Sequence, residues 1–116
     1  MLLSTRRALA EALGTGALVA TVVGSGIMAT RLTQDVAVQL LVNALATIAA
    51  LAVLIWALGP ISGAHFNPAV TLVALVRREL GAAEACRYVI AQIVGGLAGT
   101  AVGNLMFDLP AWQASM

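Results

Sequence analysis

The distribution of apolar residues along the chain predicts three helices long enough to cross a membrane. These stretches run from Ala8 to Thr30, from Val36 to Leu58, and over residues 85–107, where the uncharged part begins at Tyr88. About 20 helical residues cross a hydrocarbon core of roughly 30 Å. The first stretch contains a single charged residue, Glu11, and the second contains none. The pattern therefore predicts an all-α membrane protein with three transmembrane helices.

A shorter helix is predicted between the second and third spans. Asn-Pro-Ala at residues 67–69 is typical of a helix start, because Asn is a good N-cap and Pro is tolerated in the first turn. The ten residues from Asn67 to Val76 would form roughly 15 Å of helix, which is half a membrane. Arg77 and Arg78 follow, and they would complement the negative end of the helix dipole at the membrane surface. We therefore predict a re-entrant loop and half-helix over about residues 60–77.

The segment that precedes this half-helix limits the functions that the chain can have. Residues 61–66 precede the cap and include a glycine, so they are predicted to be irregular. A membrane permits non-helical backbone at depth only where protein covers it or where it lines a water-filled path. Pore lining is therefore the first function to test, and residues 1–116 are expected to form one domain.

Composition supports a bilayer protein. Of 116 residues, 61% are hydrophobic and 9% are charged, a balance that a small soluble domain would not sustain. The six basic residues are all Arg and face five acids, so no basic patch for nucleic acid is expected. The single cysteine, Cys86, excludes an internal disulfide and cannot by itself build a zinc site. We expect no cofactor and no metal.

Charge also predicts an orientation. Five arginines fall on one side of the three-span arrangement, and only Arg31 falls on the other. The positive-inside rule then predicts a multi-pass cell-membrane protein with a cytoplasmic N-terminus and with the tail, residues 108–116, outside. Trp56, Tyr88 and Trp112 lie close to predicted span ends, where we expect interfacial aromatic side chains.

Small residues recur at intervals of four in the first and third spans. The series are Gly95, Gly99 and Gly103 in the third span and Ala12, Gly16, Ala20 and Gly24 in the first. Faces of this kind drive helix association in lipid by close van der Waals contact. They predict a compact bundle and do not indicate a substrate.

Six polar side chains lie in the apolar part of the chain: Glu11, Asn43, Thr47, His65, Asn67 and Gln92. Ionisable residues at membrane depth normally face a partner or a water path. Glu11 is expected to accept hydrogen bonds from backbone N–H groups of the re-entrant loop, and Gln92 to add a scaffold hydrogen bond. An alternative is a membrane hydrolase with Glu11 and His65 as general bases, but the sequence has no recognisable nucleophile motif. His65 is expected to order the loop.

These features together resemble a known family. The sequence SGAHFNPAVT at residues 62–71 is similar to the first signature loop of the aquaporin and glycerol-facilitator superfamily. Two further matches are Glu11 within residues 10–15 and the segment 88–92 followed by a glycine pair. The order of span, span, half-helix and span also agrees. The whole chain resembles the N-terminal half of a member of the bacterial solute-conducting branch.

The resemblance implies roles for individual residues. The residues expected to line the pore are Gly63, Ala64, His65, Asn67, Pro68, Ala69 and Thr47, and those expected to support the loop are Glu11 and Gln92. Carbonyl groups of residues 63–65 would accept hydrogen bonds from the solute, and the Asn67 amide would donate one. Thr47 falls where the family sets its filter width. A small polar residue there resembles branches that pass glycerol or uncharged arsenous acid as well as water.

The chain also departs from the family pattern. A complete member has six spans and a second, inverted Asn-Pro-Ala half-helix followed by a filter arginine, whereas residues 109–116 fall where a connector to a fourth span would be. We therefore expect a half-channel in the lipid bilayer that needs a separately supplied second half or a homo-oligomer. An inverted identical copy conflicts with the arginine asymmetry, and it would carry Val70 where the filter arginine belongs. The alternative is a truncated, non-conducting membrane fragment or an interaction subunit.

Overall fold

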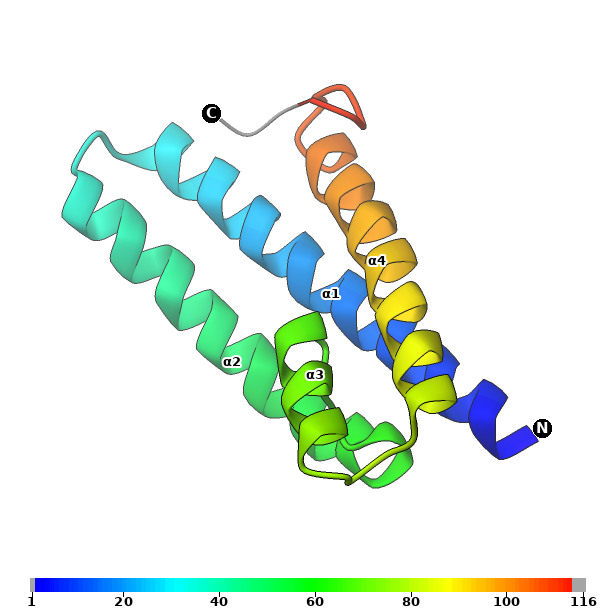
Figure 1. Ribbon diagram of the computed structural model, residues 1–116. Coiled ribbons are helices and arrows are strands. Elements are labelled where there is room, and N and C mark those ends of the chain that lie inside the picture. Colours follow the sequence, from blue (N-terminus) through cyan, green and yellow to red (C-terminus); the bar gives the residue numbers. More distant parts are fainter. Residues whose placement is uncertain (1, 114–116) are drawn as a thin grey trace.

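Four helices make up the part of the chain that the computed structural model describes, residues 2–113 (Figure 1). They are α1 Leu2–Leu32, α2 Val36–Ser62, α3 Pro68–Val76 and α4 Ala82–Leu105, and residues 2–113 contain no strand. Three of the four, α1, α2 and α4, are long and apolar enough to cross a membrane. The predicted all-α fold class is therefore confirmed. Residues 114–116 of the predicted outer tail lie outside the described residues.

The helices differ from the predicted spans at several ends. α1 begins at Leu2, and the leucines and arginines among residues 2–7 are good helix formers. α4 begins after Gly81, earlier than predicted, and ends at Leu105. α2 continues through Pro60 to Ser62, so the irregular segment begins at Gly63 and not at residue 61. A proline in the last turn removes one helical hydrogen bond, but its fixed φ is compatible with helix.

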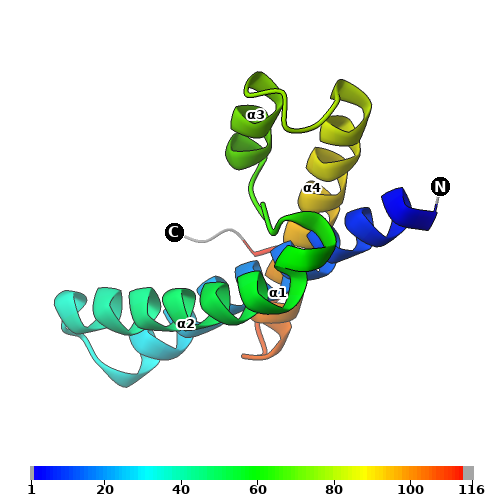
Figure 2. The same ribbon diagram turned by 90° about the horizontal axis from the view of Figure 1, so that it is seen from below.

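The helices pack around α1. α1 contacts α2 along one side and crosses α4, whereas α3 packs against α4 (Figure 1). Seen from below, α3 and the first part of α4 stand away from the layer formed by α1 and α2 (Figure 2). Within residues 2–113, α2 packs against no helix other than α1, and of its residues only Ser62 is buried. Most of the apolar surface of α2 is therefore exposed.

The crossing of α1 and α4 depends on the predicted small residues. A Cβ atom at Gly95 would collide with the backbone carbonyl of Ala12, and one at Gly99 would collide with that of Gly16. The two backbones approach this closely because glycine carries no side chain. The predicted close packing of the first and third spans is therefore confirmed.

Polar contacts hold the end of the bundle where α1 and α4 end and α2 begins. The Arg31 guanidinium donates a 2.8 Å hydrogen bond to the Phe107 carbonyl and lies 5.3 Å from the centroid of the Phe107 ring. Asp35 caps α2 by accepting hydrogen bonds from the N–H groups of Ala37 and Val38. The Arg31–Phe107 contacts join the C-terminal ends of α1 and α4, as expected when α1 and α4 run in the same direction through a membrane.

Candidate functional site

The irregular segment between α2 and α3 has an unusual backbone. Gly63 ends α2 in the left-handed region with φ 86°, and its N–H donates to the Gly59 carbonyl at 2.8 Å. Ala64 and Phe66 also have positive φ, 52° in each case. The left-handed conformation costs a non-glycine residue roughly 1–2 kcal/mol. Such backbone persists only where its surroundings hold it in place.

The buried carboxylate of Glu11 holds this segment. One oxygen, Oε2, accepts hydrogen bonds from the Ser62 hydroxyl at 2.6 Å and from the His65 N–H at 3.1 Å. The other, Oε1, accepts from the Phe66 N–H and from the Gln92 amide, each at 2.8 Å. Glu11 is fully buried. Because four donors occupy both oxygens, this carboxylate has no geometry for acting as a general base.

A second set of contacts joins the segment to α3 and α4. The Gln92 amide nitrogen donates to the Thr71 hydroxyl at 2.9 Å, and the same hydroxyl lies 2.9 Å from His65 Nδ1. Thr71 and Gln92 are both buried. Side chains from α1, α3 and α4 therefore form one hydrogen-bonded cluster with residues 62–66. Sequence reasoning did not identify Thr71.

Tyr88 corrects one prediction. We expected an interfacial aromatic side chain, but Tyr88 is 4% exposed. Its hydroxyl donates a 2.6 Å hydrogen bond to the Ser62 carbonyl, and its ring centroid lies 5.0 Å from that of His65. Position alone could have suggested this contact, because Tyr88 lies four residues before Gln92 and so shares its helix face.

Phe66 fills the space left by a glycine. Its ring occupies the position that a Cβ atom on Gly14 would take, and Phe66 is 4% exposed. Phe66 is thus anchored to α1 by its backbone N–H and by its ring. No local sequence pattern links these two positions.

Tyr88→Phe is expected to lower the free energy of unfolding by about 1 kcal/mol, because the buried Ser62 carbonyl loses its donor. Reversible unfolding of the purified chain in mixed micelles would measure this difference. Thr100→Val is the matched control, since within residues 2–113 the Thr100 hydroxyl bonds only to the Gly96 carbonyl of its own helix. An equal loss in both variants would contradict a supporting role for Tyr88.

The backbone N–H and carbonyl groups of the segment differ in whether they have hydrogen-bond partners. Every backbone N–H from Gly63 to Phe66 has a partner within the protein. By contrast, no described residue donates to the carbonyl groups of Gly63, Ala64 or His65. The segment therefore offers a row of three unpaired acceptors.

Asn67 follows directly and begins α3. Its side-chain oxygen accepts a 2.8 Å hydrogen bond from the Ala69 N–H, and Pro68 is the first helical residue. This geometry agrees with the predicted helix start. The Asn67 NH2 group has no partner among residues 2–113, and Asn67 is exposed at the positive end of the α3 dipole. A polar neutral molecule beside this segment would meet acceptors and then a donor.

A polar cavity of about 330 Å³ adjoins the same segment. It lies towards the end of the bundle where α2 ends and α4 begins. Its lining includes Arg7, Gly63, His65, Glu79, Glu84 and Tyr88. The segment is therefore accessible from that end.

Thr47 lies apart from this cluster. Its hydroxyl donates a 2.7 Å hydrogen bond to the Asn43 carbonyl of its own helix, α2. Asn43 in turn donates to the Val22 carbonyl and to the Ser25 hydroxyl, which ties α2 to α1. No hydrogen bond joins Thr47 to the irregular segment within residues 2–113. The structure brings Glu11, His65 and Gln92 together but not Thr47.

Three helices of membrane-crossing length, with a short helix begun by Asn-Pro and an irregular loop between the second and third of them, define a helical membrane protein. A comparison with known protein families identifies it further, because residues 2–112 match the family described as major intrinsic protein. The chain belongs to that family, which includes the aquaporins, and is a membrane protein. Members of this family are channels, so the membrane-enzyme alternative is excluded.

Individual relatives agree with the family match. The chain is 59% identical over 112 residues to aquaglyceroporin AqpS of Rhizobium meliloti, which covers 97% of this chain and 48% of that protein. It is 50% identical over 52 residues to glycerol uptake facilitator protein-like 6 of Lactiplantibacillus plantarum, covering 45% of this chain and 24% of that protein. It is 47% identical over 53 residues to aquaporin-5 of Sus scrofa, covering 46% and 20% respectively. The chain spans about half the length of the aquaglyceroporin.

Proposed function

We propose that residues 2–112 form the first half of a passive transmembrane channel for water or small neutral solutes of the glycerol type. The observation that carries this proposal is the row of unpaired carbonyls at Gly63, Ala64 and His65, followed by the free NH2 group of Asn67. The 59% identity to a protein named an aquaglyceroporin supports the solute class. Uncharged arsenous acid, which also presents hydroxyl groups, belongs to the same class.

The proposed mechanism exchanges hydrogen bonds. A neutral molecule that leaves water donates to the carbonyls of residues 63–65 and accepts from Asn67, so its desolvation is offset. A cation meets the positive end of α3 instead and is repelled. Thr47 is proposed to lie on the pore wall of the complete channel, where its small side chain leaves room for a solute wider than water.

A second repeat is required to enclose the path. The exposed apolar surface of α2 supports this requirement, because within residues 2–113 α1 is the only helix that packs along α2, and α4 reaches only the last residue of α2, Ser62, through Tyr88. Large apolar side chains that are exposed on α2 include Leu40, Leu41, Leu45, Ile48, Val53 and Ile55. We propose that a second repeat, from the same or another chain, covers part of this surface. We also propose that the N-terminus is cytoplasmic. The alternative function is a non-conducting membrane fragment or interaction subunit.

Reconstitution tests the two functions against each other. The chain would be incorporated into liposomes alone and together with the C-terminal half of the Rhizobium meliloti aquaglyceroporin, and osmotic shrinkage would report water and glycerol permeability. We expect permeability above that of lipid only when both halves are present. Permeability equal to that of lipid with both halves present would favour the non-conducting alternative.

Asn67→Asp is expected to raise the cation leak of the conducting assembly by more than tenfold. The substitution places a carboxylate at the positive end of α3, and a unit charge about 4 Å from a cation contributes about 4 kcal/mol at an effective dielectric constant of 20. Sodium flux and glycerol flux in the same liposomes would measure the change. Gln113→Glu adds the same charge outside the helices and serves as the control. An unchanged sodium flux in Asn67→Asp would contradict a pore role for Asn67.

A further inference from the structure

The buried hydroxyl group of Thr71 has few possible hydrogen-bond partners. Thr71 is 0% exposed, so its hydroxyl is shielded from water. Two nitrogen atoms lie 2.9 Å from its oxygen, the Gln92 amide nitrogen and His65 Nδ1. The hydroxyls of Thr47 and Thr100 donate to the carbonyl four residues earlier in their helices. Thr71 makes no such contact within residues 2–113, so its hydrogen bonds must be shared between the two nitrogens.

The Gln92 contact fixes one of the two directions. The same amide nitrogen lies 2.8 Å from Glu11 Oε1. The Glu11 carboxylate already accepts from three other donors, so it accepts from Gln92 as well. The end of the amide that faces both Glu11 and Thr71 is therefore the NH2 group, which can only donate. The Thr71 oxygen must accept this bond, and its own proton is left to be donated elsewhere.

His65 Nδ1 is the acceptor that remains for this proton. A neutral imidazole has one nitrogen that donates and one that accepts, and the hydrogen bond at one nitrogen sets the tautomer. If Nδ1 carried the ring proton, two N–H groups would point at the Thr71 oxygen. The buried Thr71 O–H would then have no acceptor among residues 2–113, which is unfavourable. The geometry therefore favours the ring with its proton on Nε2.

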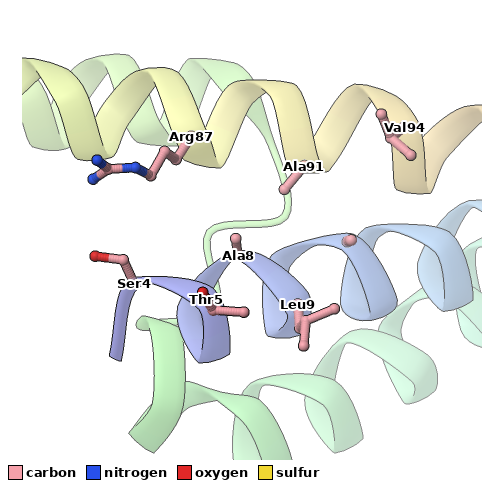
Figure 3. A pocket seen from close by; sticks show the side chains of 8 residues that line it. Ser4, Thr5, Ala8, Leu9, Arg87, Ala91 and Val94 are labelled. Atoms are coloured by element: carbon pink, nitrogen blue, oxygen red, sulfur yellow. The ribbon is translucent and has the colours of Figure 1, made fainter. Parts of the chain in front are cut away.

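The groove between α1 and α4 does not bring water to this cluster. Figure 3 shows small side chains facing this groove of about 470 Å³, with Arg87 at one end. Gln92, Thr71 and His65 are not among its lining residues. Thr71 borders another groove, of about 330 Å³ between α3 and α4, which is otherwise lined by apolar side chains and Cys86. The Thr71 hydroxyl therefore depends on protein groups for its hydrogen bonds.

We propose that Gln92 and Thr71 hold His65 as the tautomer with its proton on Nε2, and that this N–H serves the polar cavity beside the irregular segment. His65 and Gly63 both line that cavity, and Nε2 lies 3.5 Å from the position that a Cβ atom on Gly63 would take. Nε2 has no hydrogen-bond partner within residues 2–113. Thr71 is thus a positioning residue that acts through His65.

The tautomer decides what His65 offers to a solute. With its proton on Nε2 the ring donates, and the unpaired carbonyls of residues 63–65 accept, so a hydroxyl group in the cavity finds both kinds of partner. With the other tautomer, Nε2 would be one more acceptor. The role towards a solute rests on the proposed function, whereas the tautomer itself does not.

Nitrogen NMR of the purified chain in detergent micelles tests the tautomer. His65 is the only histidine in the sequence, so labelling with ¹⁵N-histidine reports on this ring alone. Spectra would be recorded at mildly alkaline pH, where an ordinary imidazole is neutral. We expect Nε2 to resonate as a protonated ring nitrogen and Nδ1 as an unprotonated nitrogen that accepts a hydrogen bond. A protonated Nδ1 in the wild-type chain would overturn the proposal.

Two variants of Thr71 separate the hydrogen bond from packing. Thr71→Val keeps the shape without the hydroxyl, and we expect the Nδ1 and Nε2 resonances to move towards each other as both tautomers become populated. Thr71→Ser keeps the hydroxyl and should retain the wild-type positions.

Tyr88→Phe is the matched control for these spectra. It removes a buried hydroxyl beside the same ring, but that hydroxyl bonds to the Ser62 carbonyl and not to His65. Unchanged resonances in Thr71→Val, or equal changes in Thr71→Val and Tyr88→Phe, would overturn the role of Thr71. The measurement uses the chain alone, so its outcome is independent of whether the complete assembly conducts.

Discussion

Glu11→Ala is expected to release the segment between α2 and α3 and to lower the free energy of unfolding by about 3 kcal/mol or more. The substitution removes the acceptor of the donors on Ser62, His65 and Phe66 and one of the two acceptors of the Gln92 amide nitrogen, which keeps Thr71. Each buried donor without a partner costs about 1–3 kcal/mol unless water reaches it. The left-handed conformations of Ala64 and Phe66 would also lose the contacts that hold them. Reversible unfolding in mixed micelles would measure the loss.

Glu11→Gln separates this local role from general stability. The variant keeps the shape but exchanges one acceptor oxygen for an NH2 group, so at least one of the two loop N–H groups loses its partner. We expect faster amide hydrogen exchange at His65 and Phe66, with unchanged exchange in the middle of α2. Glu79→Gln serves as the control, because Glu79 is exposed and, among the described residues, its carboxylate pairs only with Arg77. Unchanged exchange at His65 and Phe66 in Glu11→Gln would contradict the anchoring role of the carboxylate.

The start of α3 could be predicted because its cause is local. Asn67, Pro68 and Ala69 contain both the cap acceptor and the proline of the first turn, and the structure has the helix start there. The hydrogen bonds of Glu11 to the loop were also expected, since a lone carboxylate in an apolar span needs donors. The particular donors could not be predicted, because Phe66 and Gln92 are distant from Glu11 in sequence and meet it only after the helices cross.

Other parts of the site depend on tertiary contacts that no local pattern reveals. Tyr88 near a span end is typical of an interfacial side chain, and only the position of Ser62 at the end of α2 makes it a buried donor. The extra turn of α2 was missed because Pro60 and Gly59 favour a helix end when read alone. The left-handed backbone of Phe66 could not be expected, since its ring is accommodated only by the absence of a side chain at Gly14.

The small residues of α4 were predicted as a face, and the structure separates their roles. A Cβ atom at Gly99 would collide with the Gly16 carbonyl of α1, a backbone atom that cannot move without displacing its helix. A Cβ atom at Gly96 would lie 3.8 Å from a methyl group of Thr15, which is ordinary van der Waals contact. Gly96 and Gly99 lie one helical turn apart. An added methyl group would collide with backbone at Gly99, whereas at Gly96 it would make an ordinary contact.

Gly99→Ala is accordingly expected to destabilise the chain by about 1–3 kcal/mol, the usual cost of overpacking a close contact. Gly96→Ala is expected to be neutral or slightly stabilising, because alanine has the better helix propensity and the space exists. Unfolding in mixed micelles would measure both variants under identical conditions. Separation of α1 from α4 would also lengthen the contact between Glu11 and Gln92, so amide exchange at Phe66 should accelerate in Gly99→Ala and not in Gly96→Ala. Equal stability of the two variants would contradict the assignment of the helix crossing to Gly99.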